Sequence, residues 1–167
     1  RWHKTLKKEF NQDKYYANKF GSACMQGPRI VNWYRGVAEG FGGDPNYIDK
    51  PNISEDCLYL NIWIPRDNVN NKDIPVLLYI HGGYWISRSK SDQTFLAKPF
   101  VEAGVAFGLI EYDLIPNVRM DDIVRQCRSA VAWLHANSHS YGLDRNRFHL
   151  SGHSAGGHLT AMLSSTD

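Results

Sequence analysis

The sequence lacks the features that mark a membrane, fibrous or disordered protein. No apolar run approaches the ~18 residues that a membrane-spanning helix needs, since the longest, Val76–Ile80, has five. Internal repeats and low-complexity segments are missing as well. The composition, with 43% hydrophobic, 22% charged and 13% aromatic residues over 167 positions, is typical of a globular protein. A single domain without a membrane span is therefore expected.

The chain also has little net charge. Its formal charge is +2, too small for the field that nucleic-acid binding requires. The basic surplus is local, because residues 1–20 hold six basic and two acidic side chains, a net charge of +4. A solvated basic arm explains this better than a binding patch, so we expect no nucleic-acid partner.

The sequence begins at Arg1, without an initiator methionine or an apolar signal segment. We therefore expect a processed, trimmed or internal piece, and treat residues 1–167 as one partial domain. Residues 1–52 are rich in glycine, asparagine, proline and aromatic residues with little periodicity, which predicts a loop-rich segment. Residues 53–167 should hold the sheet and its helices.

Apolar patterns predict strands over residues 58–64, 75–80, 105–111 and 147–150. The first stretch alternates apolar and polar residues, which is typical of a strand with one apolar face. It ends at Pro65, and the polar stretch 66–73 should form a turn. The second is apolar on both faces, as in a parallel sheet that helices cover on both sides. The last of these strands would lie at an exposed edge of the sheet, which folded proteins normally cover or pair.

Helical patterns separate these strands. A helix over 92–103 should begin after Ser91, kink or split at Pro99 and stop at Gly104. The longest pattern, 119–137, has acidic residues in its first turn, and Gly142 follows its end. The alternation of strands and helices predicts an α/β fold with a mostly parallel sheet. The apolar stripe of the longest helix comprises Met120, Ile123, Val124, Cys127, Ala130, Val131 and Leu134.

The pentapeptide Gly-His-Ser-Ala-Gly at 152–156 has the G-x-S-x-G pattern of a nucleophile elbow. It follows a predicted strand and opens a predicted helix, which is where such an elbow must lie. The strained turn requires small flanking residues, and the Ser154 hydroxyl would stand at the positive end of a helix dipole. An ordinary glycine–serine turn is the alternative, which the context disfavours.

A second glycine-rich turn, His-Gly-Gly-Tyr-Trp at 81–85, follows the strand predicted over 75–80. Acyl transfer needs backbone N–H groups directed at the oxyanion, and glycine lets a backbone approach that closely. We expect these donors to be the N–H groups of Gly83, Tyr84 and Ala155, with Gly82 permitting the turn. His81 is expected to brace the loop.

The chain offers no convincing catalytic base. Where a nucleophile elbow supplies the serine, the catalytic residues follow one another along the chain as Ser, then Asp or Glu, then His. Only 13 residues follow Ser154, which is too few for the acid and the base to come from later strands. His158 is one helical turn further on and should pack within the elbow, while the backbone of His153 leads away from the serine hydroxyl. We expect a missing C-terminal half, or a second chain, to supply the base and to complete the sheet.

Residues 75–167 resemble the α/β-hydrolases, most closely the kynurenine formamidase (arylformamidase)-like esterases. Besides the two glycine-rich turns, the matching stretches are 90–92, 112–114, 121–124 and 150–159. The resemblance implies a central sheet with helices on both faces, of which this chain would be the N-terminal half, an oxyanion loop at 82–84 and Ser154 as nucleophile. That family acts on small N-formyl aromatic amides and esters. No cofactor or metal ion is expected.

Residues 19–65 resemble the type B carboxylesterases and cholinesterases, in the stretches 19–26 and 54–65. In those proteins the two cysteines of these motifs close a disulfide loop, which implies that Cys24 pairs with Cys57 and that Cys127 stays free. The chain departs from their pattern at Tyr84, where they have a third glycine, and at His153, where they have glutamate. A disulfide and the glycosylation pattern at 52–54 favour secretion, whereas the formamidase resemblance implies the cytosol.

These features predict a serine hydrolase that cleaves a carboxylic ester or a small aryl formamide through an acyl-enzyme on Ser154. Tyr84 and Trp85, beside the oxyanion loop, would suit an aromatic or small acyl substrate, or they belong to the core. The alternatives are a non-catalytic, cholinesterase-like adhesion protein, against which an intact Ser154 argues, and an inactive truncated fragment.

Overall fold

The computed structural model describes residues 20–65 and 73–165. Almost all of the basic arm over residues 1–20 and most of the turn expected over 66–73 lie outside these ranges. None of the helices in the described ranges is long and apolar enough to cross a membrane.

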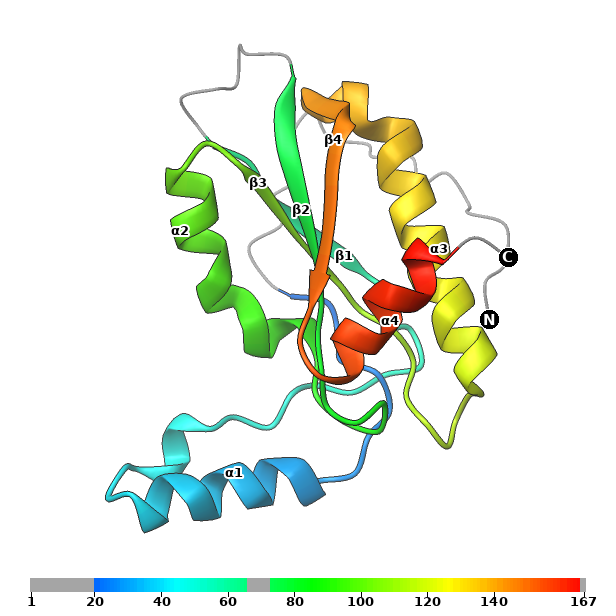
Figure 1. Cartoon of the computed structure of the whole chain (residues 1–167). Helices are drawn as coiled ribbons and strands as arrows, with labels where there is room; N and C mark the ends of the chain where they lie inside the picture. Colours follow the sequence, from blue (N-terminus) through cyan, green and yellow to red (C-terminus); the bar gives the residue numbers. More distant parts are fainter. Residues whose placement is uncertain (1–19, 66–72, 166–167) are drawn as a thin grey trace, which may run out of the picture.

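The described chain forms a four-stranded mixed sheet with the order β1-β3-β2-β4 (Figure 1). The strands are β1 (Leu60–Trp63), β2 (Ile74–Ile80), β3 (Ala106–Ile110) and β4 (Leu143–Gly152). β2 pairs in parallel with both β3 and β4, whereas β1 runs antiparallel to β3. The predicted α/β fold with a mostly parallel sheet is confirmed, and β4 is longer than the strand expected over 147–150.

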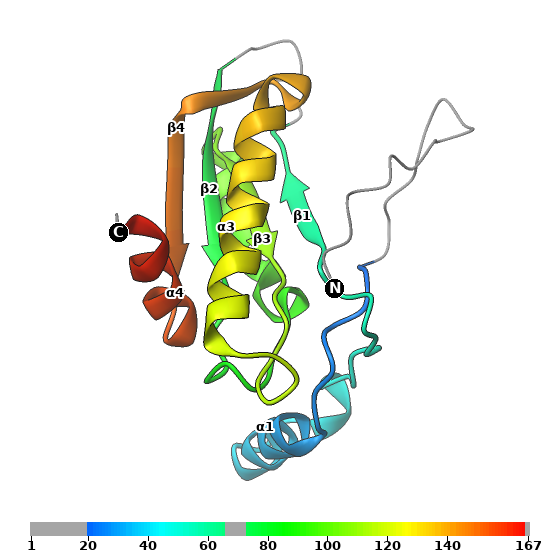
Figure 2. The same ribbon diagram turned by 90° about the vertical axis from the view of Figure 1, so that its right-hand side faces the viewer.

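Helices cover the two faces of the sheet unequally. α3 (Met120–Asn137) and α4 (Ala155–Ser164) pack on one face, and the shorter α2 (Ala97–Glu102) packs on the other (Figure 1). Figure 2 shows α3 lying across the first face. Along β2, Val76, Leu78 and Ile80 are fully buried against the first face, while Leu77 and Tyr79 are only half-buried on the second. The predicted apolar stripe of α3 lies against this larger core.

The segment expected to be one helix over 92–103 is divided in two. A 3₁₀ segment, η3 (Lys90–Leu96), precedes α2, and Ser89 rather than Ser91 is its N-cap, with the Asp92 carboxylate accepting from the Ser89 N–H at 3.0 Å. Because α2 begins at Ala97, Pro99 lies in its first turn, where a backbone N–H has no partner within the helix. Of the two expected outcomes the segment is therefore split rather than kinked, and the new helix begins two residues before the proline.

The expectation of a loop-rich segment over residues 1–52 misses one helix. α1 (Arg29–Gly40) begins after Pro28, and a short 3₁₀ turn, η1 (Pro45–Tyr47), follows it. Figure 1 shows α1 beyond the ends of β2 and β4, away from the faces of the sheet. This position sets α1 apart from the helices that cover the core and places it next to the turns that follow the strands.

Candidate active site

Ser154 occupies a sharp turn between β4 and α4. Its backbone has φ 57° and ψ −119°, a conformation that side-chain-bearing residues rarely adopt and that costs on the order of 1–3 kcal/mol. The side chain is exposed, whereas Ala155 and Gly156, the first residues of α4, are buried. The strand–turn–helix context predicted from the sequence is therefore present around Ser154.

The glycines on either side of Ser154 allow this turn to sit against β2. A Cβ at Gly156 would lie 1.9 Å from the Ile80 carbonyl oxygen, and a Cβ at Gly152 would lie 2.4 Å from the Gly156 backbone. Neither distance is compatible with any side chain. The small residues of the pentapeptide are thus required by backbone contact between the end of β4, the start of α4 and the end of β2.

The glycine-rich turn after β2 lies directly beside the serine. A Cβ at Gly82 would lie 2.8 Å from the His153 carbonyl oxygen and 3.4 Å from the Ser154 Cβ. Gly83 has φ +109°, and a Cβ there would lie 2.1 Å from the Ser87 carbonyl oxygen. Tyr84 also has positive φ, at 58°. The turn is therefore tightly folded and leaves no space for larger residues at its two glycines.

The three expected oxyanion donors are all available. Among the described residues, none accepts a hydrogen bond from the backbone N–H of Gly83, Tyr84 or Ala155. Gly83 and Tyr84 line the same cleft as Ser154. Free backbone N–H groups beside an exposed serine can bind a negatively charged oxygen without displacing an internal partner.

A buried ionic cluster lies behind this turn. His81 Nε2 is 2.9 Å from Glu111 Oε1, and Lys90 Nζ is 3.5 Å from Glu111 Oε2; all three residues are at most 3% exposed. Burial lowers the pKa of the Lys90 ammonium, which the charge of Glu111 opposes. The Tyr112 ring stacks on the His81 ring at 4.2 Å, and burial raises the pKa of its hydroxyl. His81 Nδ1 contacts the Gly82 carbonyl oxygen at 2.8 Å, as expected for a residue that braces the loop.

The cleft above Ser154 has a volume of about 870 Å³. Ser154 and the glycine-rich turn line it on one side, and another wall comes from the N-terminal segment, with Met25, Trp33 and Tyr34. The Arg88 guanidinium lies 4.5 Å from the centre of the Tyr34 ring. Tyr84 is 73% exposed and therefore belongs to the cleft rather than to the core.

This wall was not predicted from the sequence, because the composition of residues 1–52 favoured a loop-rich segment. The signal for a helix was the spacing of Val31, Tyr34 and Ala38, three and four residues apart, which begins three residues after Pro28. Gln26 connects this wall to the segment that follows the glycine-rich turn. Its side-chain amide donates to the Arg88 carbonyl at 3.0 Å and accepts from the Arg88 N–H at 2.9 Å.

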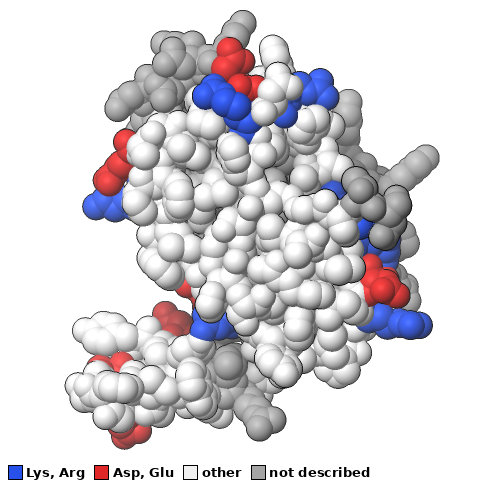
Figure 3. All heavy atoms as spheres, in the orientation of Figure 1, with Lys and Arg blue, Asp and Glu red and all other residues white. Residues whose placement is uncertain are grey.

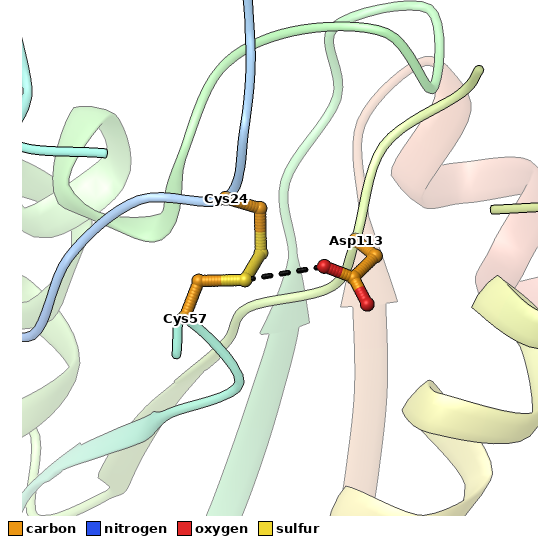
Figure 4. A group of neighbouring side chains, drawn as sticks. All are labelled: Cys24, Cys57 and Asp113. Carbon is orange, nitrogen blue, oxygen red and sulfur yellow. Dashed lines mark hydrogen bonds between the residues drawn. A yellow bond between two sulfur atoms is a disulfide. The ribbon is translucent and has the colours of Figure 1, made fainter. Parts of the chain in front are cut away.

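A disulfide between Cys24 and Cys57 closes the N-terminal segment, with both residues fully buried, and Cys127 is free and buried. The predicted pairing is therefore confirmed. Figure 4 shows the Asp113 carboxylate directed at this bridge, with Oδ1 3.2 Å from Cys57 Sγ. Although these three residues are close enough to hold an ion, sulfurs joined in a disulfide have no thiolate to offer a metal.

No histidine within the described ranges hydrogen-bonds to the Ser154 hydroxyl. His158 packs edge-on against Trp85 at 5.3 Å, and His153 is exposed at the cleft. His135 contacts the Arg145 carbonyl oxygen at the far end of α3. The part of the chain that the structure describes thus brings Ser154 and the glycine-rich turn together, but no histidine in it is hydrogen-bonded to the serine.

Comparisons with known proteins agree with this geometry. A family model described as BD-FAE matches residues 60–167, and the model of the carboxylesterase family matches residues 1–112. Each covers more than half of the chain. The chain therefore belongs to the α/β-hydrolase superfamily.

The relatives are longer proteins. Kynurenine formamidase from Salmo salar is 41% identical over 109 residues, which are 65% of this chain and 35% of that protein. Esterase LipC from Mycobacterium tuberculosis is 33% identical over 105 residues, 62% of this chain and 26% of that protein. This chain thus spans about a third or less of the length of these two relatives.

Solved structures show the same partial overlap. The propionate-bound esterase Est2 from Thermogutta terrifontis superposes with a TM-score of 0.60 at 28% identity, covering 65% of this chain and 40% of that one. A thermophilic pNB esterase superposes with a TM-score of 0.69 at 24% identity and covers 86% of this chain and 29% of that one. The second match includes part of the N-terminal segment and bears on the fold alone.

Proposed function

We propose that this chain carries the nucleophile and the oxyanion hole of a serine hydrolase that cleaves a carboxylic ester or a small aryl formamide. The single observation that carries the proposal is the strained, exposed Ser154 beside three unpaired backbone N–H groups. Esterases and kynurenine formamidases among the relatives support the same chemistry. The reaction requires neither a metal nor a cofactor in this scheme.

In the proposed mechanism the Ser154 hydroxyl attacks the carbonyl carbon of the substrate and forms a tetrahedral intermediate. The negative charge on the former carbonyl oxygen is bound by the N–H groups of Gly83, Tyr84 and Ala155, each worth roughly 10²–10³ in rate. Departure of the leaving group gives an acyl-enzyme, or a formyl-enzyme for a formamide, which water then hydrolyses.

The proton of Ser154 must pass to a base that the described residues do not offer. We propose that a histidine outside residues 1–167, in the rest of the protein or in a second chain, takes this role together with an acidic residue that orients it. The longer relatives support this assignment. We call the form in which Ser154 has its base the catalytically complete protein.

The free edge of β4 supports the same proposal. Among the described strands β4 pairs only with β2, so its outer backbone groups are unpaired. Charged side chains gather around the rim of the face that contains β4, and the centre of that face is largely uncharged (Figure 3). A strand from the missing part would pair with this edge and cover this face. The disulfide favours an oxidising compartment, and we propose secretion.

Labelling with a fluorophosphonate tests the proposed nucleophile. The catalytically complete protein should react covalently at Ser154, identified by peptide mass spectrometry, and Ser154→Ala should abolish the labelling. Ser164→Ala, on the exposed last turn of α4, is the matched control and should label normally. Residues 1–167 alone should react slowly, because a serine hydroxyl without a base is a weak nucleophile near neutral pH.

Two results would contradict this assignment. Absence of labelling in the catalytically complete protein would favour a non-catalytic binding protein. Rapid labelling of residues 1–167 that is lost in His158→Ala would show that the base lies within the chain after all.

A further inference from the structure

The buried cluster of His81, Glu111 and Lys90 has no role in the reaction described so far. His81 is the residue after β2, Glu111 is the residue after β3, and Lys90 is the first residue of η3. Their contacts therefore join these three elements behind Gly82 and Gly83. Placing three ionisable groups in the interior is costly unless their hydrogen bonds are satisfied. The pattern of these hydrogen bonds determines where the protons are.

Both ring nitrogens of His81 face hydrogen-bond acceptors. Nδ1 lies 2.8 Å from the Gly82 carbonyl oxygen, which can only accept, so Nδ1 must carry a proton. Nε2 lies 2.9 Å from Glu111 Oε1. The other oxygen of this carboxylate accepts from the Lys90 backbone N–H at 3.1 Å and from the Lys90 ammonium at 3.5 Å. These donors favour an ionised carboxylate, so the proton shared with His81 lies on Nε2.

The environment of the ring suits a cation. The Tyr112 ring is stacked on the imidazole with an interplanar angle of 8°, an arrangement in which an aromatic face stabilises positive charge. The Tyr112 hydroxyl donates to the His81 carbonyl oxygen at 2.8 Å and is 3.3 Å from the Gly82 carbonyl oxygen. The hydroxyl has a single proton and its nearer acceptor is His81, so the main donor to the Gly82 carbonyl is the His81 ring.

The Gly82 carbonyl is coupled to the oxyanion hole through one peptide unit. The carbonyl of Gly82 and the N–H of Gly83 belong to the same planar trans peptide and point in opposite directions. A hydrogen bond that holds the carbonyl toward His81 therefore holds the N–H away from His81. Gly83 lines the cleft beside Ser154, and its N–H has no acceptor among the described residues.

We propose that His81 is an imidazolium, protonated on both nitrogens, that orients and polarises the Gly82–Gly83 peptide so that the Gly83 N–H donates more strongly to the oxyanion. A charge-assisted hydrogen bond is stronger than a neutral one, and hydrogen bonds in series polarise one another. His81 is thus a positioning residue, held in its charged form by Glu111. The catalytic consequence rests on the proposed function, whereas the protonation state does not.

Nitrogen-15 NMR of the histidine rings tests the protonation state in the catalytically complete protein. At pH 7 both His81 nitrogens should have the chemical shifts of protonated nitrogen, with the resonance assigned by its loss in His81→Asn. In Glu111→Gln the Nε2 proton should be lost, while the exposed control Glu102→Gln should leave the spectrum unchanged. A neutral tautomer of His81 in the wild type would overturn the proposal.

Kinetics test the consequence. Glu111→Gln should lower kcat about tenfold with KM unchanged, less than the ~10²–10³ lost with a whole oxyanion donor, because the neutral ring still donates to Gly82. His81→Asn should retain part of kcat, since its amide nitrogen replaces Nδ1, and His81→Leu should lose about 10². An unchanged kcat in Glu111→Gln would overturn the polarising role. Failure of Ser154 to react with a fluorophosphonate would instead refute the proposed function and leave the NMR result standing.

Discussion

At the scale of single residues, Gly156 illustrates how strictly the elbow limits its sequence. A Cβ added there would meet the Ile80 carbonyl oxygen at 1.9 Å, so Gly156→Ala should displace α4 from β2. We expect the free energy of unfolding to fall by at least ~1–3 kcal/mol, as for other overpacked sites, and fluorophosphonate labelling of the catalytically complete protein to be lost.

Gly36→Ala is the matched control, because a Cβ at this position in α1 has nothing within 4 Å. It should raise the free energy of unfolding by ~0.5–1 kcal/mol through helix propensity. Urea unfolding of both variants measures the difference. Equal stabilities would show that the contact between Gly156 and Ile80 is not as close as described.

The buried Cys127 makes stability depend on pH. Burial raises the pKa of its thiol from 9.0 to about 12. Between these values the unfolded chain releases a proton that the folded chain keeps, so the free energy of unfolding should fall as the pH rises, by at most ~1.4 kcal/mol per pH unit. Cys127→Ala should reduce this slope in urea titrations between pH 9 and 10, leaving the smaller part that Tyr112 contributes as its hydroxyl, with an ordinary pKa of 10.0, begins to ionise in the unfolded chain. Parallel slopes in the two proteins would contradict the assignment.

Single residues were predictable where backbone geometry restricts the choice of residue. The glycines around Ser154 follow from the space that a strand–turn–helix leaves, and a sequence pattern captures that constraint. Glu111 and Lys90 were not predictable in this way. Glu111 contacts His81 and Lys90, which lie 30 and 21 positions earlier in the chain, and only the fold determines that these residues meet in the interior.

At the scale of elements, the disulfide fixes one wall of the cleft. It joins residues 33 positions apart and holds Gln26 against the Arg88 backbone. Replacing both Cys24 and Cys57 with alanine should lower the free energy of unfolding by roughly 3–4 kcal/mol in the chain-entropy model. The wall that includes Trp33 should then be less firmly placed relative to Ser154.

Thiol counting in denaturant checks this pairing. Without a reductant one thiol per chain should react with Ellman's reagent, from Cys127, and three should react after reduction. Three reactive thiols without reduction would refute the disulfide.

Most elements were predictable because their burial is periodic. The strand at 75–80 and the helix at 119–137 have long apolar patterns, and the structure places them within one or two residues of the expected bounds. α1 was missed because it lies outside the main core and contains glycine at position 36. Pro99 predicted that the segment over 92–103 would kink or split, but the start of η3 was not predicted. It is held by the contacts of Ser89 with Asp92 and of Lys90 with Glu111, which the local sequence does not reveal.

At the scale of the whole molecule, the unpaired edge of β4 governs behaviour in solution. Residues 1–167 expressed alone should aggregate or pair through β4, because exposed strand edges recruit other strands. If a further part of the protein or a second chain covers this edge, as proposed, adding it in trans should restore a soluble complex and, with it, the proposed esterase activity. Size-exclusion chromatography with light scattering and hydrogen exchange measures this outcome. A stable monomer with protected amides along the outer edge of β4 would contradict the proposal that another strand covers it.

The segment between Cys24 and Cys57 is a covalent ring whose two ends meet at one point beside the sheet. Lengthening a loop costs little free energy once its ends are joined, only about 0.6 kcal/mol for each doubling. Insertions near η1, which packs against α1, would therefore change the surroundings of the cleft wall while Ser154 and the turn at 81–85 stay in place. If the proposed function holds, the part of the molecule that performs the reaction is separate from the part that contacts the reactant, and the second can change in length without disturbing the first.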